Sequence, residues 1–170
     1  QAALRVGYRD YLRWQAENLG QAADGSRIAD LAGWWRRELD GLDATPTLVP
    51  DPDAAATRTA GVVDVDFDAD LRRKLVSLAG GKATEFMTVH AVFAALLHRL
   101  HGDPEVHLAG AASDVVIGTP VAGRTDPRLA DLVGMFVNSV VLRTKVDGDA
   151  GFSTLLDTIR STDLEALSQA

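Results

Sequence analysis

Apolar residues recur at helical spacing over the N-terminal part of the chain. One candidate helix is marked by Tyr8, Leu12 and the stretch 14–19. A second is marked by Ile28, Leu31, Trp34, Trp35 and Leu39. Two helices are therefore expected to open the chain.

The helical pattern breaks between Gly41 and Gly61. This stretch contains Pro46, Pro50 and Pro52 among Asp, Ala and Thr residues, and it has no clear period. An irregular connector of this length is uncommon inside a compact domain, so we expect it to cross a surface.

A strand followed by a capped helix is expected next. Residues 63–67 alternate apolar side chains with Asp64 and Asp66, the two-residue period of a strand with one buried face. Asp68 is a candidate N-cap because its carboxylate can accept from free N–H groups of a first helical turn. The apolar positions of this helix are Leu71, Leu75 and Leu78, and Gly80 and Gly81 form its stop.

The clearest helical pattern follows Thr84, a candidate N-cap. Its apolar stripe consists of Phe86, Val89, His90, Phe93, Leu96, Leu97 and Leu100. We expect this segment to be a core helix.

The C-terminal part predicts two strands and a closing helix. Val115 to Ile117 is a short candidate strand that ends at Gly118, and residues 135–142 are too short and too β-branched to favour a helix. The closing amphipathic helix carries Phe152, Leu155, Leu156, Ile159, Leu164 and Leu167. Strands separated by helices predict a layered α/β fold.

Composition narrows the classes of function. The 170 residues are 46% hydrophobic and carry 17 basic and 24 acidic side chains, for a net charge of −7. One domain of this size can bury a substantial core, and its charge disfavours nucleic acid as a partner. The absence of cysteine suits a cytosolic protein. No apolar stretch of about 18 residues predicts a membrane span, and the residue pattern indicates no export signal.

Sequence motifs for common chemistries are missing. There is no Gly-x-Ser-x-Gly nucleophile turn, and Gly118, Gly123 and Gly134 do not have phosphate-loop spacing. The histidines lack metal-site spacing, so no metal is expected; they are His90, His98, His101 and His107. His90 lies on the apolar stripe and is interpreted as a hydrogen-bonded core histidine.

Two further groups of side chains have structural interpretations. The aromatic residues Tyr8, Tyr11, Trp14, Trp34 and Trp35 are expected to pack inward from amphipathic helices rather than form a stacking surface. The acidic positions lack the order of an EF-hand and are expected to form a solvated edge. These positions are Asp51, Asp53, Asp64, Asp66, Asp68 and Asp70.

Asn138 interrupts the apolar run 135–142. With strict alternation it projects on the same face as Phe136, Val140 and Leu142. A buried amide must find partners, because burying it unpaired is costly. Two interpretations stay open: the amide holds the backbone of a neighbouring loop, or it faces a ligand.

Residues 116–143 resemble, almost position for position, the fifth core motif of nonribosomal peptide synthetase condensation domains. Residues 8–15, Tyr-Arg-Asp-Tyr-Leu-Arg-Trp-Gln, resemble the fourth core motif, and residues 84–100 resemble the helix between them. Two departures are Met135, where the family usually has Phe, and a longer loop at residues 101–113.

This resemblance implies a chloramphenicol acetyltransferase-like fold, in which two αβα lobes surround a tunnel. Residues 1–60 would be helices and a connector after an N-terminal lobe, and residues 61–170 would be part of the C-terminal αβα lobe, incomplete in this chain. A sheet divided in this way leaves unpaired edges, so we expect the rest of the domain to be needed for a stable fold.

The implied activity is amide formation between aminoacyl or peptidyl thioesters. Carrier-protein domains present these substrates on phosphopantetheine arms, and no cofactor is bound directly. The family's catalytic His-His-x-x-x-Asp-Gly motif is absent, because no two histidines are adjacent in this chain. The chain is thus expected to begin just after that motif and to contain no catalytic residue.

The resemblance also singles out support residues. Asn138 matches an asparagine close to the active-site tunnel, and the signature turn matches Gly118, Thr119, Pro120, Gly123 and Arg124. Small residues there permit close backbone approach, and Arg124 is expected to brace the loop. Two alternatives stay open: a catalytically inactive domain that recruits tailoring enzymes to a carrier-bound peptide, and a free-standing acyltransferase that uses coenzyme A.

Overall fold

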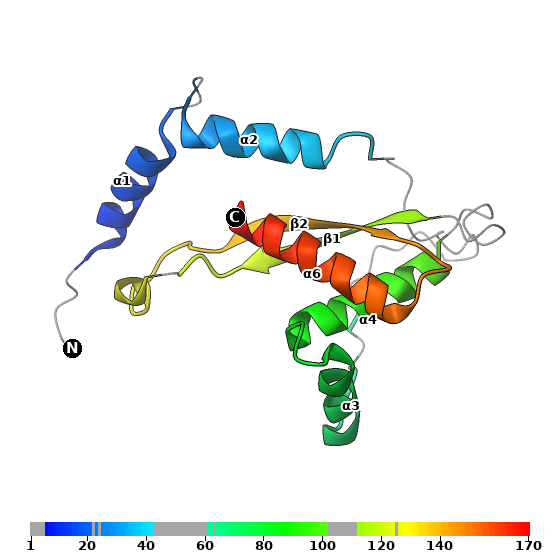
Figure 1. The fold of residues 1–170 in the computed structure, drawn as a ribbon. Helices are drawn as coiled ribbons and strands as arrows, with labels where there is room; N and C mark the ends of the chain where they lie inside the picture. The colour runs from blue at the N-terminus through cyan, green and yellow to red at the C-terminus, as the bar shows by residue number, and fades with distance from the viewer. Residues whose placement is uncertain are drawn as a thin grey trace. The chain divides into compact units, whose positions relative to one another are not determined.

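The computed structural model of the protein describes residues 6–21, 23, 25–42, 61–62, 64–101, 112–124 and 126–170. Its elements are α1 (Tyr8–Leu19), α2 (Arg27–Glu38), α3 (Ala69–Ala79), α4 (Glu85–Arg99), β1 (Ser113–Val121), the 3-10 helix η1 (Pro127–Leu129), β2 (Asn138–Val146) and α6 (Phe152–Ser168). β1 and β2 pair in a two-stranded sheet and run in opposite directions (Figure 1).

The chain divides into two compact units, which alternate along the sequence. The first contains Gln1–Leu42, Ile117–Leu142 and Glu165–Ala170, and the second contains Asp43–Val116 and Arg143–Leu164. Each of β1, β2 and α6 therefore contributes residues to both units. The predicted connector between Gly41 and Gly61 lies almost wholly outside the described residues.

The caps predicted for α3 and α4 are confirmed. The Asp68 carboxylate accepts from the Leu71 N–H at 2.7 Å, and the Thr84 hydroxyl accepts from the Met87 N–H at 3.2 Å. Gly80 ends α3 in the left-handed conformation, with φ of +55°.

The core face of α4 is not the apolar stripe that the sequence predicts. Five of the seven stripe residues are between 40% and 53% exposed: Phe86, Val89, Phe93, Leu96 and Leu100. The buried face instead carries Met87, Thr88, His90, Ala91, Ala94 and His98. Small side chains let α4 approach its neighbours closely, whereas the larger apolar residues pack against little within the described part of the chain.

Polar contacts fix α4 within the second unit. The Nδ1 atom of His90 lies 2.9 Å from Oδ1 of Asp163 on α6, and both side chains are almost completely buried. His98 contacts the Ser113 hydroxyl at the start of β1, at 2.7 Å. The interpretation of His90 as a hydrogen-bonded core histidine is confirmed.

The predicted strand at residues 63–67 is wrong. Residues 64–68 are irregular, and Val65 and Phe67 are 68% and 53% exposed; Val63 lies outside the described residues. A strand requires a hydrogen-bonding neighbour, and within the described ranges the sheet pairs only β1 with β2. The described acidic positions here, residues 64, 66, 68 and 70, are exposed as expected, whereas Asp51 and Asp53 lie outside the described part.

The boundaries of the two observed strands also differ from prediction. β1 extends beyond residues 115–117 at both ends, and Val116 is 39% exposed, so this strand is only partly buried. β2 begins at Asn138 and continues to Val146, so Met135 and Phe136 belong to the preceding loop. The closing helix is confirmed, although Leu164 and Leu167 remain partly exposed while Asp163 and Ala166 are buried.

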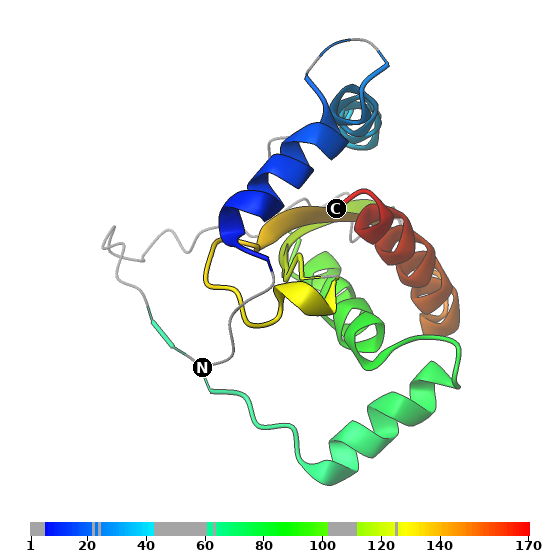
Figure 2. The same cartoon turned by 90° about the vertical axis from the view of Figure 1, so that its left-hand side faces the viewer.

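Two aromatic clusters organise the first unit. Tyr8 and Tyr11 pack against a cluster of Leu129, Leu132 and Phe136. Trp34 and Trp35 pack against a second cluster that contains Val140, Leu142 and Ala166. The inward packing predicted for these aromatic residues is confirmed for four of them, whereas Trp14 is 57% exposed. Figure 2 shows α1, in blue, beside the yellow loop that precedes β2.

Candidate functional site

The predicted signature turn places Gly123 directly against the loop that precedes β2. Gly123 has φ of +62°, and a Cβ added there would overlap the backbone carbonyl of Phe136. Only glycine combines this dihedral angle with this approach at low energetic cost. At Gly118, by contrast, an added Cβ would meet no described atom within 4 Å. The close approach expected of the turn therefore occurs at Gly123 and not at Gly118.

Arg124 connects the turn to two parts of the following loop. Its guanidinium group donates a hydrogen bond to the Leu129 carbonyl oxygen. The same group lies over the Phe136 ring, with Cζ 4.0 Å from the ring centroid, which is a cation–π contact. The loop-bracing hydrogen bond expected of Arg124 is thus present in the structure.

Tyr8, at the start of α1, contacts the same loop from another element. Its hydroxyl donates to the Met135 carbonyl oxygen at 3.0 Å. Its ring lies against Gly134, where any Cβ would overlap the ring, and meets the Phe136 ring edge-on at 5.4 Å between centroids. The two sequence stretches that resemble family motifs are therefore in contact at Phe136.

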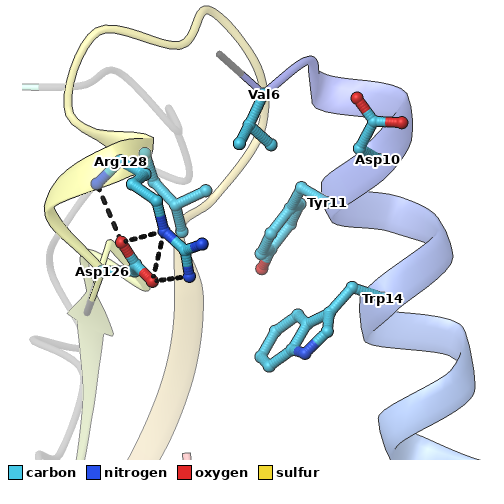
Figure 3. Close-up of a pocket in the computed structure, with 7 residues that line it drawn as sticks. Val6, Asp10, Tyr11, Trp14, Asp126 and Arg128 are labelled. Carbon is cyan, nitrogen blue, oxygen red and sulfur yellow. Dashed lines mark hydrogen bonds and ion pairs between the residues drawn. The ribbon is translucent and has the colours of Figure 1, made fainter.

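A pocket of about 290 Å³ lies between α1 and the loop that contains Asp126 and Arg128 (Figure 3). Tyr11 and Trp14 project from α1 towards Asp126 and Arg128 of the loop. The remaining lining residues are Val6, Asp10 and Leu129. Tyr11, in the wall of the pocket, also contacts the rings of Tyr8 and Phe136.

An ion pair forms one side of the pocket. The Arg128 guanidinium donates to both Asp126 carboxylate oxygens, with Nε 3.0 Å from each, and the Arg128 backbone N–H donates to Oδ1 at 2.8 Å. These bonds lower the pKa of Asp126 from 3.8 to about 2 and raise the pKa of Arg128. The pair is solvent-exposed, so it fixes the loop's geometry more than it stabilises the fold.

Asn138 is the first residue of β2, and its side chain is exposed. By the alternation of β2 it lies on the same face as the buried Val140 and Leu142, as the sequence predicts, but at the end of the strand this face is not covered. The Asn138 side-chain oxygen accepts from the neighbouring Ser139 N–H at 2.9 Å. The amide therefore contacts its own strand, and it does not line the pocket beside α1.

The structure brings together some of the predicted site residues and leaves others apart. Gly123 and Arg124 contact Phe136, two residues before Asn138. Gly118, Thr119 and Pro120 lie on β1, away from the pocket lining. Tyr8 and Phe136 were not predicted as site residues, although their positions inside the two family-like stretches were an available signal.

Two other features, a metal-binding cluster and a membrane-spanning helix, are absent from the described part of the chain. No group of three or more His, Asp or Glu side chains is placed there to hold a metal ion. None of the helices in those ranges has both the length and the apolar character needed to cross a membrane.

Comparison with known proteins identifies the family. The family described as "Condensation domain" matches residues 2–170. The chain is 41% identical over 97% of its length to an isonitrile lipopeptide synthase of Mycobacterium tuberculosis, and it covers 6% of that protein. It is 37% identical, also over 97% of its length, to a dimodular nonribosomal peptide synthase of Bacillus subtilis, of which it covers 7%.

A solved structure shows the same fold. The X-domain from teicoplanin biosynthesis, solved in complex with OxyB, superposes with a TM-score of 0.80 at 28% identity. That match covers 99% of this chain and 36% of the X-domain chain. The prediction of an α/β lobe of the chloramphenicol acetyltransferase-like fold is confirmed by this likeness together with the observed helices and strands. The chain belongs to the condensation-domain family of nonribosomal peptide synthetases.

Proposed function

We propose that this chain is part of a condensation domain that forms an amide bond between two carrier-bound substrates. The acceptor amine attacks the carbonyl carbon of the donor thioester. A C–N bond forms, the C–S bond breaks, and the amine proton leaves as the donor's phosphopantetheine thiol is released. Family membership over residues 2–170 supports this reaction. The substrates arrive on carrier-protein domains in the cytosol, and no cofactor bound to this chain is required.

The part played by these residues is to shape the passage for the substrates. No two histidines are adjacent in the chain, so the His-His-x-x-x-Asp-Gly motif is not among its residues. We assign tunnel-wall roles to Gly118, Thr119 and Pro120 on β1 and to the Asn138 amide. For Asn138 the observation that carries this assignment is its exposed side chain, two residues after the Phe136 carbonyl against which Gly123 packs. For Gly118, Thr119 and Pro120 the assignment rests on membership of the family.

Replacing Asn138 with Ala tests this role. The variant is prepared in the condensation domain that contains this chain, and dipeptide formation on loaded carrier proteins is measured. We expect turnover to fall, because the amide is lost while the buried residues of β2 are kept. Ser139→Ala is the matched control, since Ser139 is the adjacent exposed position and projects to the other face of the strand. Wild-type turnover in Asn138→Ala would rule out the site role.

A second function is favoured by one comparison. The X-domain to which this chain is similar was solved as a complex with OxyB. A domain of this kind would recruit a tailoring enzyme to a carrier-bound peptide without forming an amide bond. The two functions are separated by assaying the whole domain for dipeptide formation and, in parallel, for binding of the tailoring enzyme of its own biosynthetic system. Binding without dipeptide formation would identify the recruiting function.

A further inference from the structure

Residues 134–136, which lead into β2, are held from two sides. On one side the Tyr8 ring covers Gly134, and the Tyr8 hydroxyl binds the Met135 carbonyl at 3.0 Å. On the other side Gly123 lies against the Phe136 carbonyl, and the Arg124 guanidinium lies over the Phe136 ring. We call these contacts the 134–136 clamp.

The clamp acts on the part of the backbone that orients Asn138. β2 begins at Asn138, so residues 135–137 connect these contacts directly to the backbone of Asn138. The Asn138 side-chain oxygen accepts from the Ser139 N–H, and this bond reports whether the amide keeps its orientation. Asn138 is exposed, so the packing of its side chain restrains it little, and its backbone is held by β2 on one side and by residues 135–137 on the other.

We propose that Tyr8 is a positioning residue for the proposed condensation reaction: through its bond to Met135, it fixes the backbone that aims the Asn138 amide. This inference rests on the proposed function of Asn138. It adds to that function an element more than one hundred positions away in the sequence, at the start of α1. The Tyr8 phenol would thus affect turnover without itself touching a substrate.

The first test measures local backbone opening. Tyr8→Phe keeps the ring on Gly134 and Phe136 and removes only the hydroxyl. Tyr11→Phe is the matched control, because it removes the chain's other phenol and keeps a ring packed on Phe136. In the complete domain, hydrogen exchange over a peptide spanning residues 133–142 is followed by mass spectrometry. We expect exchange to be roughly two- to tenfold faster in Tyr8→Phe, because local opening then breaks one ordinary hydrogen bond fewer. In Tyr11→Phe we expect the exchange rate to stay unchanged.

The second test asks whether Tyr8 acts through Asn138. Dipeptide formation is measured for Tyr8→Phe, Asn138→Ala and the double variant. Tyr8→Phe is expected to lower kcat by roughly two- to tenfold. The KM for the loaded carriers should stay unchanged, because the carrier proteins bind away from the Asn138 amide. In the Asn138→Ala background, Tyr8→Phe is expected to have no further effect on kcat.

Each result decides between the alternatives. Unchanged exchange in Tyr8→Phe overturns the clamp, whether or not the domain forms dipeptide. Faster exchange with fully additive effects on kcat also overturns the inference, because Tyr8 would then stabilise the loop without acting through Asn138. A wild-type domain that forms no dipeptide contradicts the proposed function instead, and the exchange comparison then decides on the clamp by itself.

Discussion

Replacing Gly123 with Ala should destabilise the domain strongly, because two separate costs act at this position. Gly123 has φ of +62°, and a non-glycine residue in this left-handed region costs roughly 1–2 kcal/mol. The added methyl group would also overlap the Phe136 carbonyl oxygen and lie 3.1 Å from its carbonyl carbon. Both contacts are to backbone, so the loop itself must move, at a cost of roughly 1–3 kcal/mol. We expect a total loss of about 2–5 kcal/mol.

The measurement is thermal unfolding of the condensation domain that contains this chain, followed by circular dichroism. Domains of 150–250 residues lose roughly 2–4 °C per kcal/mol and longer domains lose less, so Tm should fall by several degrees and by no more than about 20 °C. Gly118→Ala is the matched control, because an added Cβ there meets no described atom within 4 Å and φ is not positive, so its Tm should stay close to wild type. Equal Tm values for the two variants would refute the reasoning, since the two glycines would then be equivalent.

Three further predictions concern other parts of the chain. His90→Leu alone should lower the free energy of unfolding by roughly 3–5 kcal/mol, because Asp163 stays buried without its partner. Adding Asp163→Ala should recover part of this loss in chemical denaturation. If the losses of the two substitutions simply add, the two side chains do not act as a buried pair. Arg128→Ala should raise the pKa of Asp126 from about 2 towards 3.8, as followed by carboxyl NMR titration, and an unchanged value would rule out Arg128 as the cause. Any stability contributed by this pair is present above pH 3.8 and is lost as pH falls through about 2. Residues 1–170 expressed alone should unfold broadly, because most of the apolar stripe of α4 is exposed, and a sharp cooperative transition would be evidence for a self-sufficient fold.

Local signals in the sequence predicted the helices well. Asp68 and Thr84 identified two helix starts because an N-cap is a contact between residues three positions apart. The burial of α4 could not be predicted in the same way. Its apolar stripe and its small-residue face are both present in the sequence, and which one packs depends on neighbours elsewhere in the chain. The strand at 63–67 failed for the same reason, because strand pairing requires a partner that local pattern does not specify.

The candidate site was predictable only in part. Gly123 and Arg124 were identified through resemblance, and their packing against Phe136 gives that resemblance a physical basis. The contact of Tyr8 with Met135 is long-range and involves a backbone carbonyl, so side-chain pattern carries no trace of it. Asn138 lies on the face of Val140 and Leu142 as expected, but it is exposed because it is the first residue of β2, and local pattern does not specify whether the end of a strand is covered.

The packing of Tyr8 on Gly134 and Phe136 has a consequence for the construction of hybrid synthetases. Residues 8 and 134–136 are far apart in sequence, yet the ring leaves no space for any side chain at Gly134. A chimaera joined anywhere between α1 and β1 would take residue 8 and residues 134–136 from different parents, so the ring would fit only where one parent supplies Tyr and the other supplies Gly at these positions. Crossover points placed before α1 or after β2 would keep both halves from one parent.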